Sequence, residues 1–130
     1  MFHRLSLHTS FAVIGLALAC AGVGTAFAAG DAAVGKRLYD QTCLGCHGDA
    51  NTPGTTGPSL VNLLGRKAGS SATGVVSRAN AEAGIVWDEQ TLDEYLSAPS
   101  EKIHGTIMPV SVRDPGTRAD LIAYLKTMTK

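Results

Sequence analysis

Apolar residues recur at helical spacing in three separate stretches of the chain, and a residue that commonly caps helices precedes each stretch. Asp31 precedes the first stretch, which continues to about residue 41. Val34, Leu38 and Thr42 fall on one face of that stretch when it is wound as a helix. The pattern therefore predicts a first helix capped by Asp31, with these three residues on one face.

A second helix is predicted from Asp88 to Ser97. Asp88 is a favourable N-cap, and Pro99 ends the segment because the residue before a proline avoids the helical conformation. The apolar stripe of this helix consists of Leu92, Tyr95 and Leu96.

A third helix is predicted near the C-terminus. Asp114 is an N-cap and Pro115 occupies the first helical position, where proline is favoured. The apolar residues that follow at helical spacing are Leu121, Ile122, Leu125 and Met128.

The middle of the chain, residues 49–79, is rich in Gly, Ser, Thr and Pro and is predicted to be mostly loop. A shorter helix is predicted near 77–83, and no convincing pair of alternating strands occurs. The fold class is therefore all-α, with loops that are long for the small apolar core available. A large apolar cofactor within the core would explain this imbalance.

The N-terminal segment has the features of an export signal. Arg4 precedes an apolar run over 11–19, and the A-x-A sequence Ala26-Phe27-Ala28 follows. We predict that 1–28 are a signal peptide, that cleavage leaves a domain of 29–130, and that this domain is periplasmic. A membrane anchor fits less well, because the run is short for a hydrocarbon core of ~30 Å. Lipid attachment at Cys20 is a lesser alternative, because the three residues before it suit lipidation poorly.

The predicted mature domain is almost neutral. The chain has 11 Lys and Arg and 11 Asp and Glu, and only Arg4 lies before residue 29, which leaves a net charge of −1. No basic run is present, so nucleic acid is not expected as a partner. The mature domain retains two cysteines, Cys43 and Cys46.

These cysteines belong to the sequence Cys43-Leu-Gly-Cys46-His47, for which three functions are conceivable. A structural zinc site requires four ligands, but only His104 remains to join these three residues, and His47 directly follows Cys46. A dithiol redox site usually opens a helix after a strand, whereas this motif follows a predicted helix. C-x-x-C-H is also the attachment motif of c-type haem, in which two thiols bond the porphyrin edge and the histidine reaches the iron.

The chain from about residue 30 to 130 resembles the small single-haem cytochromes c, in particular the soluble bacterial members related to mitochondrial cytochrome c (class I). The motifs that carry the resemblance occur in the family's order. They are Gly35-Lys-Arg-Leu-Tyr39, Cys43-Leu-Gly-Cys-His47, Gly57-Pro-Ser-Leu60, Leu63-Leu-Gly-Arg66, Ala79-Asn80, Ile85-Val-Trp87, Thr91-Leu-Asp-Glu-Tyr-Leu96, Gly105-Thr-Ile-Met108 and Arg118-Ala-Asp-Leu-Ile-Ala-Tyr-Leu-Lys126.

The resemblance implies the cytochrome c fold: three main helices plus short helices and long loops wrapped around one covalently bound haem. It implies thioether bonds at Cys43 and Cys46, and iron ligation by His47 and Met108. The carbonyl of Pro58 would accept a hydrogen bond from His47. His104 is the competing second ligand, although a solvated surface histidine near the haem edge is the favoured interpretation.

The resemblance also implies the environment of the haem. Arg66, Trp87 and Asn80 would lie near the propionates, but Val76 stands where relatives usually carry a propionate-bonding tyrosine. Tyr95 would reach the methionine sulfur. Leu60, Leu63 and Leu96 would line the pocket, and Gly35 and Tyr39 would cross the last helix at Leu121 and Tyr124.

The expected function is that of a periplasmic one-electron carrier, monomeric and not an enzyme, because both axial positions of the haem iron would be filled. Its partners would be a quinol–cytochrome c reductase, an oxidase or a dehydrogenase, in a respiratory or photosynthetic chain. The alternatives are a haem subunit fixed in a dehydrogenase or oxidase complex, and a peroxidase-like or ligand-binding cytochrome with a labile methionine. Ser100, Glu101 and Ile107 stand where mitochondrial relatives often carry lysine, so docking should depend less on salt.

Overall fold

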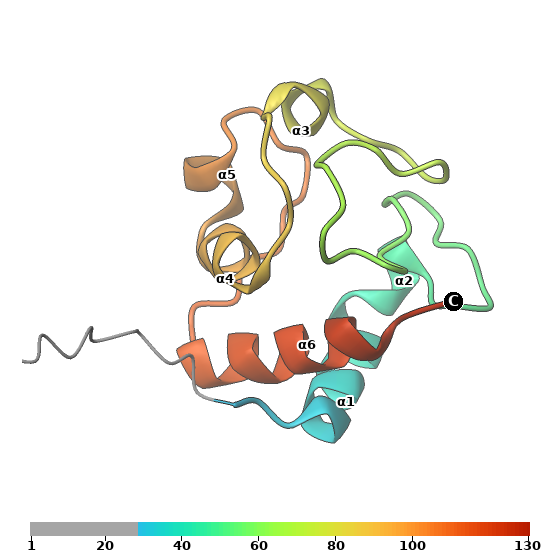
Figure 1. The fold of residues 1–130 in the computed structure, drawn as a ribbon, viewed down its shortest axis with the longest axis vertical. Helices are drawn as coiled ribbons and strands as arrows, with labels where there is room; N and C mark the ends of the chain where they lie inside the picture. Colours follow the sequence, from blue (N-terminus) through green and yellow to red (C-terminus); the bar gives the residue numbers. More distant parts are fainter. Residues whose placement is uncertain (1–28) are drawn as a thin grey trace, which may run out of the picture.

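A computed structural model describes residues 29–130 (Figure 1). The predicted signal peptide, its cleavage after Ala28 and the alternative at Cys20 concern residues outside this range. The described chain contains six helices and no strand, only two isolated bridges, so the all-α fold class is confirmed. The helices are α1 (Ala32–Thr42), α2 (Leu44–His47), α3 (Arg78–Glu82), α4 (Glu89–Ser97), α5 (Pro99–Lys102) and α6 (Pro115–Thr127). Within residues 29–130 no helix is both long and apolar enough to cross a membrane.

The three longest helices begin where their capping residues predict. The Asp31 carboxylate accepts from the backbone of Ala33 and Val34 at the start of α1. Asp88 forms a capping box at the start of α4, and Asp114 accepts from the backbone of the third residue of α6. Each aspartate satisfies backbone N–H groups that have no partner inside the helix, which fixes where the helix begins.

Helices α1 and α6 cross at close range and form the base of the molecule (Figure 1). Gly35 lies so close to α6 that an added Cβ would be 1.9 Å from the Asp120 carbonyl oxygen. Beside it the rings of Tyr39 and Tyr124 pack with centroids 5.2 Å apart. The predicted crossing of α1 by the last helix is confirmed.

The buried residues of α1 lie one position away from the apolar residues that share a face in the sequence pattern. Gly35 and Tyr39 are the buried residues of the helix, whereas Val34 and Leu38 are half-buried and Thr42 is exposed. Gly35 was predicted from the family resemblance and not from the apolar pattern, because a residue with no side chain gives no apolar signal, although it is the residue that permits the close approach.

Helix α4 packs on α6 through the stripe that the sequence predicts. Leu92, Tyr95 and Leu96 are all buried. An ion pair joins the two helices, because the Arg118 guanidinium donates to Asp93 at 2.6 Å. The same guanidinium donates to the carbonyls of Val112 and Arg113, so it also ties down the segment before α6.

The short helices lie between these longer ones. Helix α3, capped by the Ser77 hydroxyl, confirms the helix predicted near 77–83. Helices α2 and α5 were not predicted, since each has only four residues and shows no periodicity. The remaining described chain, including most of 49–77, forms loops that face α4 and α6 across the centre of the molecule (Figure 1).

Candidate functional site

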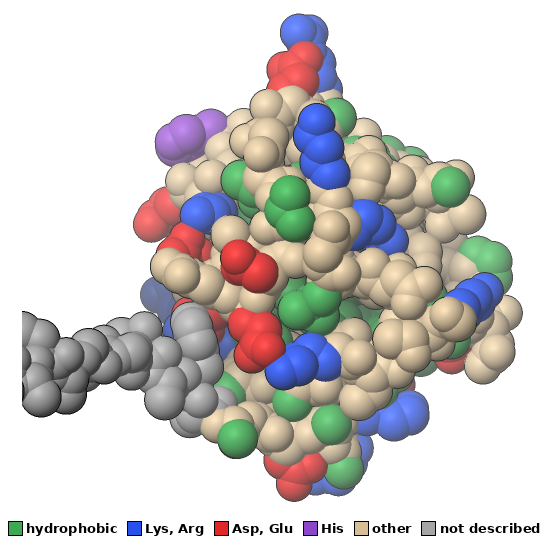
Figure 2. Space-filling view, viewed as in Figure 1, with side chains coloured by type: hydrophobic (Ala, Val, Ile, Leu, Met, Phe, Trp, Pro, Cys, Tyr) green, Lys and Arg blue, Asp and Glu red, His purple; other side chains and the backbone are tan. Residues whose placement is uncertain are grey.

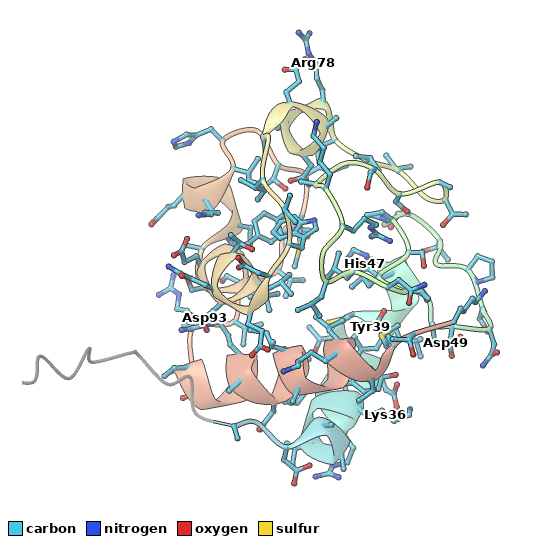
Figure 3. All side chains as sticks on the ribbon, viewed as in Figure 1. Lys36, Tyr39, His47, Asp49, Arg78 and Asp93 are labelled. Carbon is cyan, nitrogen blue, oxygen red and sulfur yellow. The ribbon has the colours of Figure 1, made fainter. Side chains whose placement is uncertain are left out.

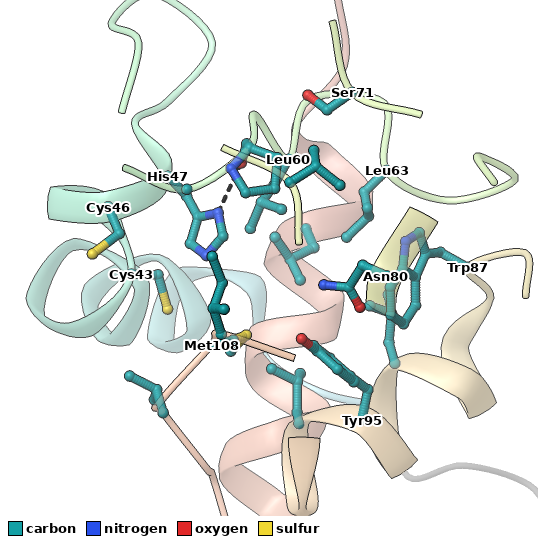
Figure 4. Close-up of a pocket in the computed structure, with 18 of the residues that line it drawn as sticks. Cys43, Cys46, His47, Leu60, Leu63, Ser71, Asn80, Trp87, Tyr95 and Met108 are labelled. Carbon is teal, nitrogen blue, oxygen red and sulfur yellow. Dashed lines mark hydrogen bonds between the residues drawn. The ribbon is translucent and has the colours of Figure 1, made fainter. Parts of the chain in front are cut away.

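A cavity at the centre of the molecule brings together all ten residues predicted for the site (Figure 4). They come from Cys43 between α1 and α2, from α2, α3 and α4, and from three loops, so no single stretch of the sequence forms the cavity. Cys43, Cys46, His47, Pro58, Leu60, Arg66, Asn80, Trp87, Tyr95 and Met108 all line it. The leucines Leu63 and Leu96 line it as predicted, as do Leu92, Leu121 and Leu125.

The motif Cys43-Leu-Gly-Cys46-His47 is wound into the single turn of α2. The turn continues from α1, because the Cys43 N–H donates to the Tyr39 carbonyl at 2.8 Å. It ends at Gly48, whose φ of 67° favours glycine. The buried Tyr39 hydroxyl donates to the Gly48 carbonyl at 2.5 Å and so fastens the end of this turn to α1 (Figure 3).

His47 is oriented by the loop that faces it. Its Nδ1 lies 2.7 Å from the Pro58 carbonyl oxygen, which fixes Nδ1 as the protonated nitrogen and leaves Nε2 as a potential metal ligand. Gly57 makes this approach possible, since a Cβ there would lie 2.7 Å from Nδ1. The hydrogen bond between His47 and Pro58 that the family resemblance implies is therefore present in the structure.

The two thiols differ in their surroundings. Cys43 is half-buried and Cys46 is exposed, and the described chain contains no disulfide. Burial raises the pKa of the Cys43 thiol to about 11, and the neighbouring Cys46 contributes in the same direction. A reactive dithiol requires a lowered pKa, so these surroundings do not favour redox chemistry at the sulfurs.

Met108 enters the cavity from the loop between α5 and α6, on the side where Tyr95 also lies (Figure 4). The hydroxyl of Thr106 organises this loop. It is 2.6 Å from the Tyr95 hydroxyl and accepts from the Met108 N–H at 3.4 Å. Tyr95 is thus bonded to Thr106 in this structure, and its predicted contact with the methionine sulfur stays a prediction.

Polar groups on the far side of the cavity are few and specific. The Arg66 guanidinium donates to the carbonyls of Ser59 at 2.6 Å and Val61 at 3.0 Å, and burial lowers its pKa. The Asn80 side chain donates weakly to Thr106, and its Oδ1 is a buried oxygen with no hydrogen-bond partner. A buried polar atom without a partner is costly, so Oδ1 marks a place where a bound group would supply one.

Sequence reasoning missed several residues that shape this site. Thr106, Ser59 and Val61 act through a hydroxyl or a backbone carbonyl, which no residue pattern identifies. Tyr39 was assigned only to the helix crossing, but it also lines the cavity. His104 is exposed and does not line the cavity, in agreement with its interpretation as a surface histidine.

The arrangement suits a flat, mostly apolar group that carries one metal ion. The cavity wall is largely aliphatic and aromatic, with a histidine and a methionine as soft or borderline ligands. Within residues 29–130 no group of three or more His, Cys, Asp or Glu side chains could hold a metal by itself. A structural zinc site is therefore not supported, whereas the ligand set fits a haem whose porphyrin supplies the remaining bonds.

Comparison with known proteins identifies the family. The family model for cytochrome c matches residues 32–129, nearly the whole described chain. The chain belongs to the cytochrome c family. Cytochromes c transfer electrons and bind one c-type haem through covalent bonds, so the cofactor prediction is confirmed for this member. Electron carriers of this family are generally not enzymes.

Individual relatives agree with this assignment. The chain is 42% identical over 99 residues to cytochrome c 2.1 of Caenorhabditis briggsae, covering 75% of this chain and 88% of that protein. It is 41% identical over 119 residues to cytochrome c2 of Rhodomicrobium vannielii, and the match covers 89% of this chain and 92% of that protein. The solved structure of cytochrome cH from Methylobacterium extorquens superposes with a TM-score of 0.67 at 39% sequence identity. The superposition covers 75% of this chain and 99% of that one.

Proposed function

We propose that this cytochrome c is a periplasmic carrier of single electrons whose haem iron is held between His47 and Met108. The observation that carries the proposal is the orientation of His47. Its Nδ1 is bonded to the Pro58 carbonyl at 2.7 Å, so Nε2 is the free nitrogen in a cavity that Met108 also lines. A residue fixed in this way presents a neutral imidazole with a defined ring orientation.

Met108 would determine the use of the site. A thioether is a soft ligand that favours Fe(II) and raises the reduction potential relative to a second histidine. When bound, the haem supplies an iron centre that gains and loses one electron. With His47 and Met108 both holding the iron, no position would be open for a substrate, and the valence change would require no change of ligands. This supports transfer of electrons rather than turnover.

The remaining predicted residues would attach the haem to the chain and surround its charged propionates. Cys43 and Cys46 would form the two thioether bonds, which α2 supports by placing both residues on the cavity wall. Arg66, Trp87 and Asn80 would face the propionates. The Asn80 Nδ2 would donate to a propionate, and the unpartnered Oδ1 would accept from a water that the bound group orders.

Export to the periplasm rests on 1–28, with their basic residue, apolar run and Ala26-Phe27-Ala28 site. The match to cytochrome c2 of Rhodomicrobium vannielii supports export, because it extends into this leading segment. The match covers 89% of the 130 residues, about 116, whereas only 102 residues follow Ala28. That relative therefore resembles part of the leading segment too. The redox partners would be a quinol–cytochrome c reductase, an oxidase or a dehydrogenase.

The test replaces each of two methionines in the holoprotein and records visible spectra of the oxidised form. Ligation by Met108 should produce a weak far-red absorption band that is insensitive to cyanide at moderate concentration. We expect Met108→Ala to abolish this band and to lower the potential. Met128→Leu is the matched control, since Met128 is buried at 5% exposure and does not line the cavity. A wild-type spectrum without the band, or rapid cyanide binding, would favour a ligand-binding cytochrome instead.

A further inference from the structure

Residues 108–113, which we call the methionine segment, connect the cavity to α6 with few hydrogen bonds of their own. Within the described chain, Val112 is the one residue of this segment whose backbone N–H donates to a backbone carbonyl, that of Leu96 at 2.7 Å. The Met108 N–H has only a long bond of 3.4 Å to the Thr106 hydroxyl. A segment with so few bonds opens locally at small cost, so each additional contact contributes strongly to keeping it closed.

Arg118 in α6 supplies two of these additional contacts. Its Nη1 donates to the carbonyls of Val112 at 3.0 Å and of Arg113 at 2.7 Å. Its Nε and Nη2 donate to the two carboxylate oxygens of Asp93 at 2.6 Å and 3.3 Å, a bidentate geometry that fixes the plane of the guanidinium. Arg118 is itself buried, with 9% of its surface exposed. One buried side chain therefore joins α4, α6 and the methionine segment.

A second ion pair joins the same two helices but does not contact the methionine segment. The Lys126 ammonium in α6 is bound by Glu89 at the start of α4, and Glu89 is its one hydrogen-bond partner within residues 29–130. Acidic and basic side chains accordingly lie next to one another where α4 faces α6 (Figure 2). The side chains of this second pair are 50% and 41% exposed, against 11% and 25% for Arg118 and Asp93. It therefore offers a comparison in which the helices are joined and the segment is not held.

We propose that Arg118, oriented by Asp93, is a positioning residue for Met108 and keeps the methionine segment closed over the distal side of the cavity. The inference rests on the proposed function and adds to it the control of the distal ligand. Without the two carbonyl bonds the segment opens more often, and each opening withdraws Met108 and admits small ligands. Arg118 does not line the cavity, so it acts on the site only through the segment.

The test measures the rate at which cyanide binds the oxidised holoprotein, because Met108 must leave before cyanide can bind. Arg118→Lys retains a cation that can pair with Asp93, but an ammonium group lacks the planar fork that also reaches the carbonyls. We expect cyanide to bind about tenfold faster or more, the effect of losing one hydrogen bond to a charged group, and the far-red band to weaken. Lys126→Gln is the matched control and should leave both the rate and the band unchanged.

A double variant separates positioning of Met108 from a general loosening of the protein. In a Met108→Ala background the distal side chain is already absent, so adding Arg118→Lys should change the cyanide rate by less than about twofold. A general loosening would accelerate cyanide binding in both backgrounds. If Arg118→Lys does not assemble with haem, Asp93→Asn replaces it in both backgrounds, because it leaves Arg118 in place but removes the partner that orients it. The same direction of change is expected.

Three results would overturn the positioning proposal: an unchanged cyanide rate in Arg118→Lys, an equal acceleration in Lys126→Gln, or an equal acceleration in the Met108→Ala background. The wild-type holoprotein separates such a failure from a failure of the proposed function. If it shows the far-red band and a reversible one-electron wave, the proposed function stands whatever the Arg118 variants do. If it lacks both, the proposed function and the positioning role fail together.

Discussion

At the scale of single residues, the cavity combines strongly apolar walls with a few polar groups held by backbone carbonyls. Pro58 orients His47, and Ser59 and Val61 orient Arg66. In each case the polar partner is a carbonyl in the same loop, 58–61, so one short segment positions both an imidazole and a guanidinium. Changes to these side chains should therefore alter the potential of the bound group more than the fold.

Arg66 provides the clearest test of charge at this scale. A cation near the iron destabilises the oxidised state, which carries the additional positive charge. We expect Arg66→Gln to lower the reduction potential by roughly a few tens of millivolts, as a partly screened charge would. The measurement is a spectroelectrochemical titration of the holoprotein.

The control for that experiment is Arg78→Gln. Arg78 projects from α3 away from the body of the molecule (Figure 3), and its guanidinium is paired with Glu82. Its removal should leave the potential unchanged. An unaltered potential in Arg66→Gln, or an equal shift in both variants, would contradict the assignment of Arg66 to the cofactor environment.

At the scale of elements, the sequence predicts well those helices that have both a cap and a periodic apolar face. Asp31, Asp88 and Asp114 mark where α1, α4 and α6 begin. Helices α2 and α5 are stabilised by their neighbours and are too short for a periodic signal. The apolar pattern alone does not identify the buried face of α1, because its key residue, Gly35, contributes space rather than apolar surface. Gly35 was predicted from the family resemblance instead.

The residues of the candidate site were predicted from family motifs, whereas the helices were predicted from local sequence pattern. Its ten residues were named from family motifs, and the structure gathers all of them at one cavity. Local pattern alone left three chemistries open for Cys43, Cys46 and His47. The hydroxyl of Thr106 and the carbonyls of the 58–61 loop could not be predicted, since their roles arise from tertiary contacts between distant segments.

The crossing of α1 and α6 should tolerate no side chain at Gly35. An added Cβ would meet the Asp120 carbonyl oxygen at 1.9 Å, so Gly35→Ala must push the helices apart. We expect a loss of about 1–3 kcal/mol in the free energy of unfolding, measured by urea denaturation of the holoprotein.

Gly45 supplies the matched control, because a Cβ there would meet nothing within 4 Å. Gly45→Ala lies in α2 and should be neutral or slightly stabilising, since alanine favours a helix. Equal stability of the two variants would show that the close approach of α1 to α6 does not limit packing.

The cap of α4 should make part of the stability depend on pH. Hydrogen bonds from the Thr91 backbone and hydroxyl hold the pKa of Asp88 below its ordinary value of 3.8. A lowered folded pKa stabilises the folded protein at neutral pH, and this contribution is lost as the pH falls from the ordinary value through the folded one. Asp88→Ala should lower the Tm at neutral pH by roughly a few degrees.

Asp88→Asn separates the cap from the charge, because asparagine also caps helices. It should retain most of the stability at neutral pH but lose less of it on acidification than the wild-type protein. Thermal unfolding followed by circular dichroism at neutral and acid pH measures this difference. An acid limb identical to that of the wild-type protein would exclude a contribution from Asp88.

At the scale of the whole molecule, the cavity and the hydrophobic core are largely the same set of residues. The buried hydrophobic residues that also line the cavity are Tyr39, Leu63, Trp87, Leu92, Tyr95, Leu96, Leu121 and Leu125. The described chain therefore surrounds a space at its centre with much of its apolar surface. A domain of this size has little other core from which to draw stability.

The bound group should accordingly be part of the folded structure. A chain in which both attachment sites are removed, Cys43→Ser with Cys46→Ser, should lose cooperative thermal unfolding and much of its far-ultraviolet helix signal. The haem-loaded wild-type protein is the comparison, measured under the same conditions. A sharp transition and full helix content in the double variant would show that the polypeptide folds without its cofactor.

The central claim is that one haem, ligated by His47 and Met108, exchanges single electrons in this protein. A redox titration of the mature protein with visible spectra at each potential tests it most directly. We predict a single reversible one-electron wave, and an oxidised form whose far-red methionine–iron band disappears in Met108→Ala but remains in Met128→Leu. A band that survives in Met108→Ala, or a spectrum that responds to cyanide without any reversible wave, would contradict the account.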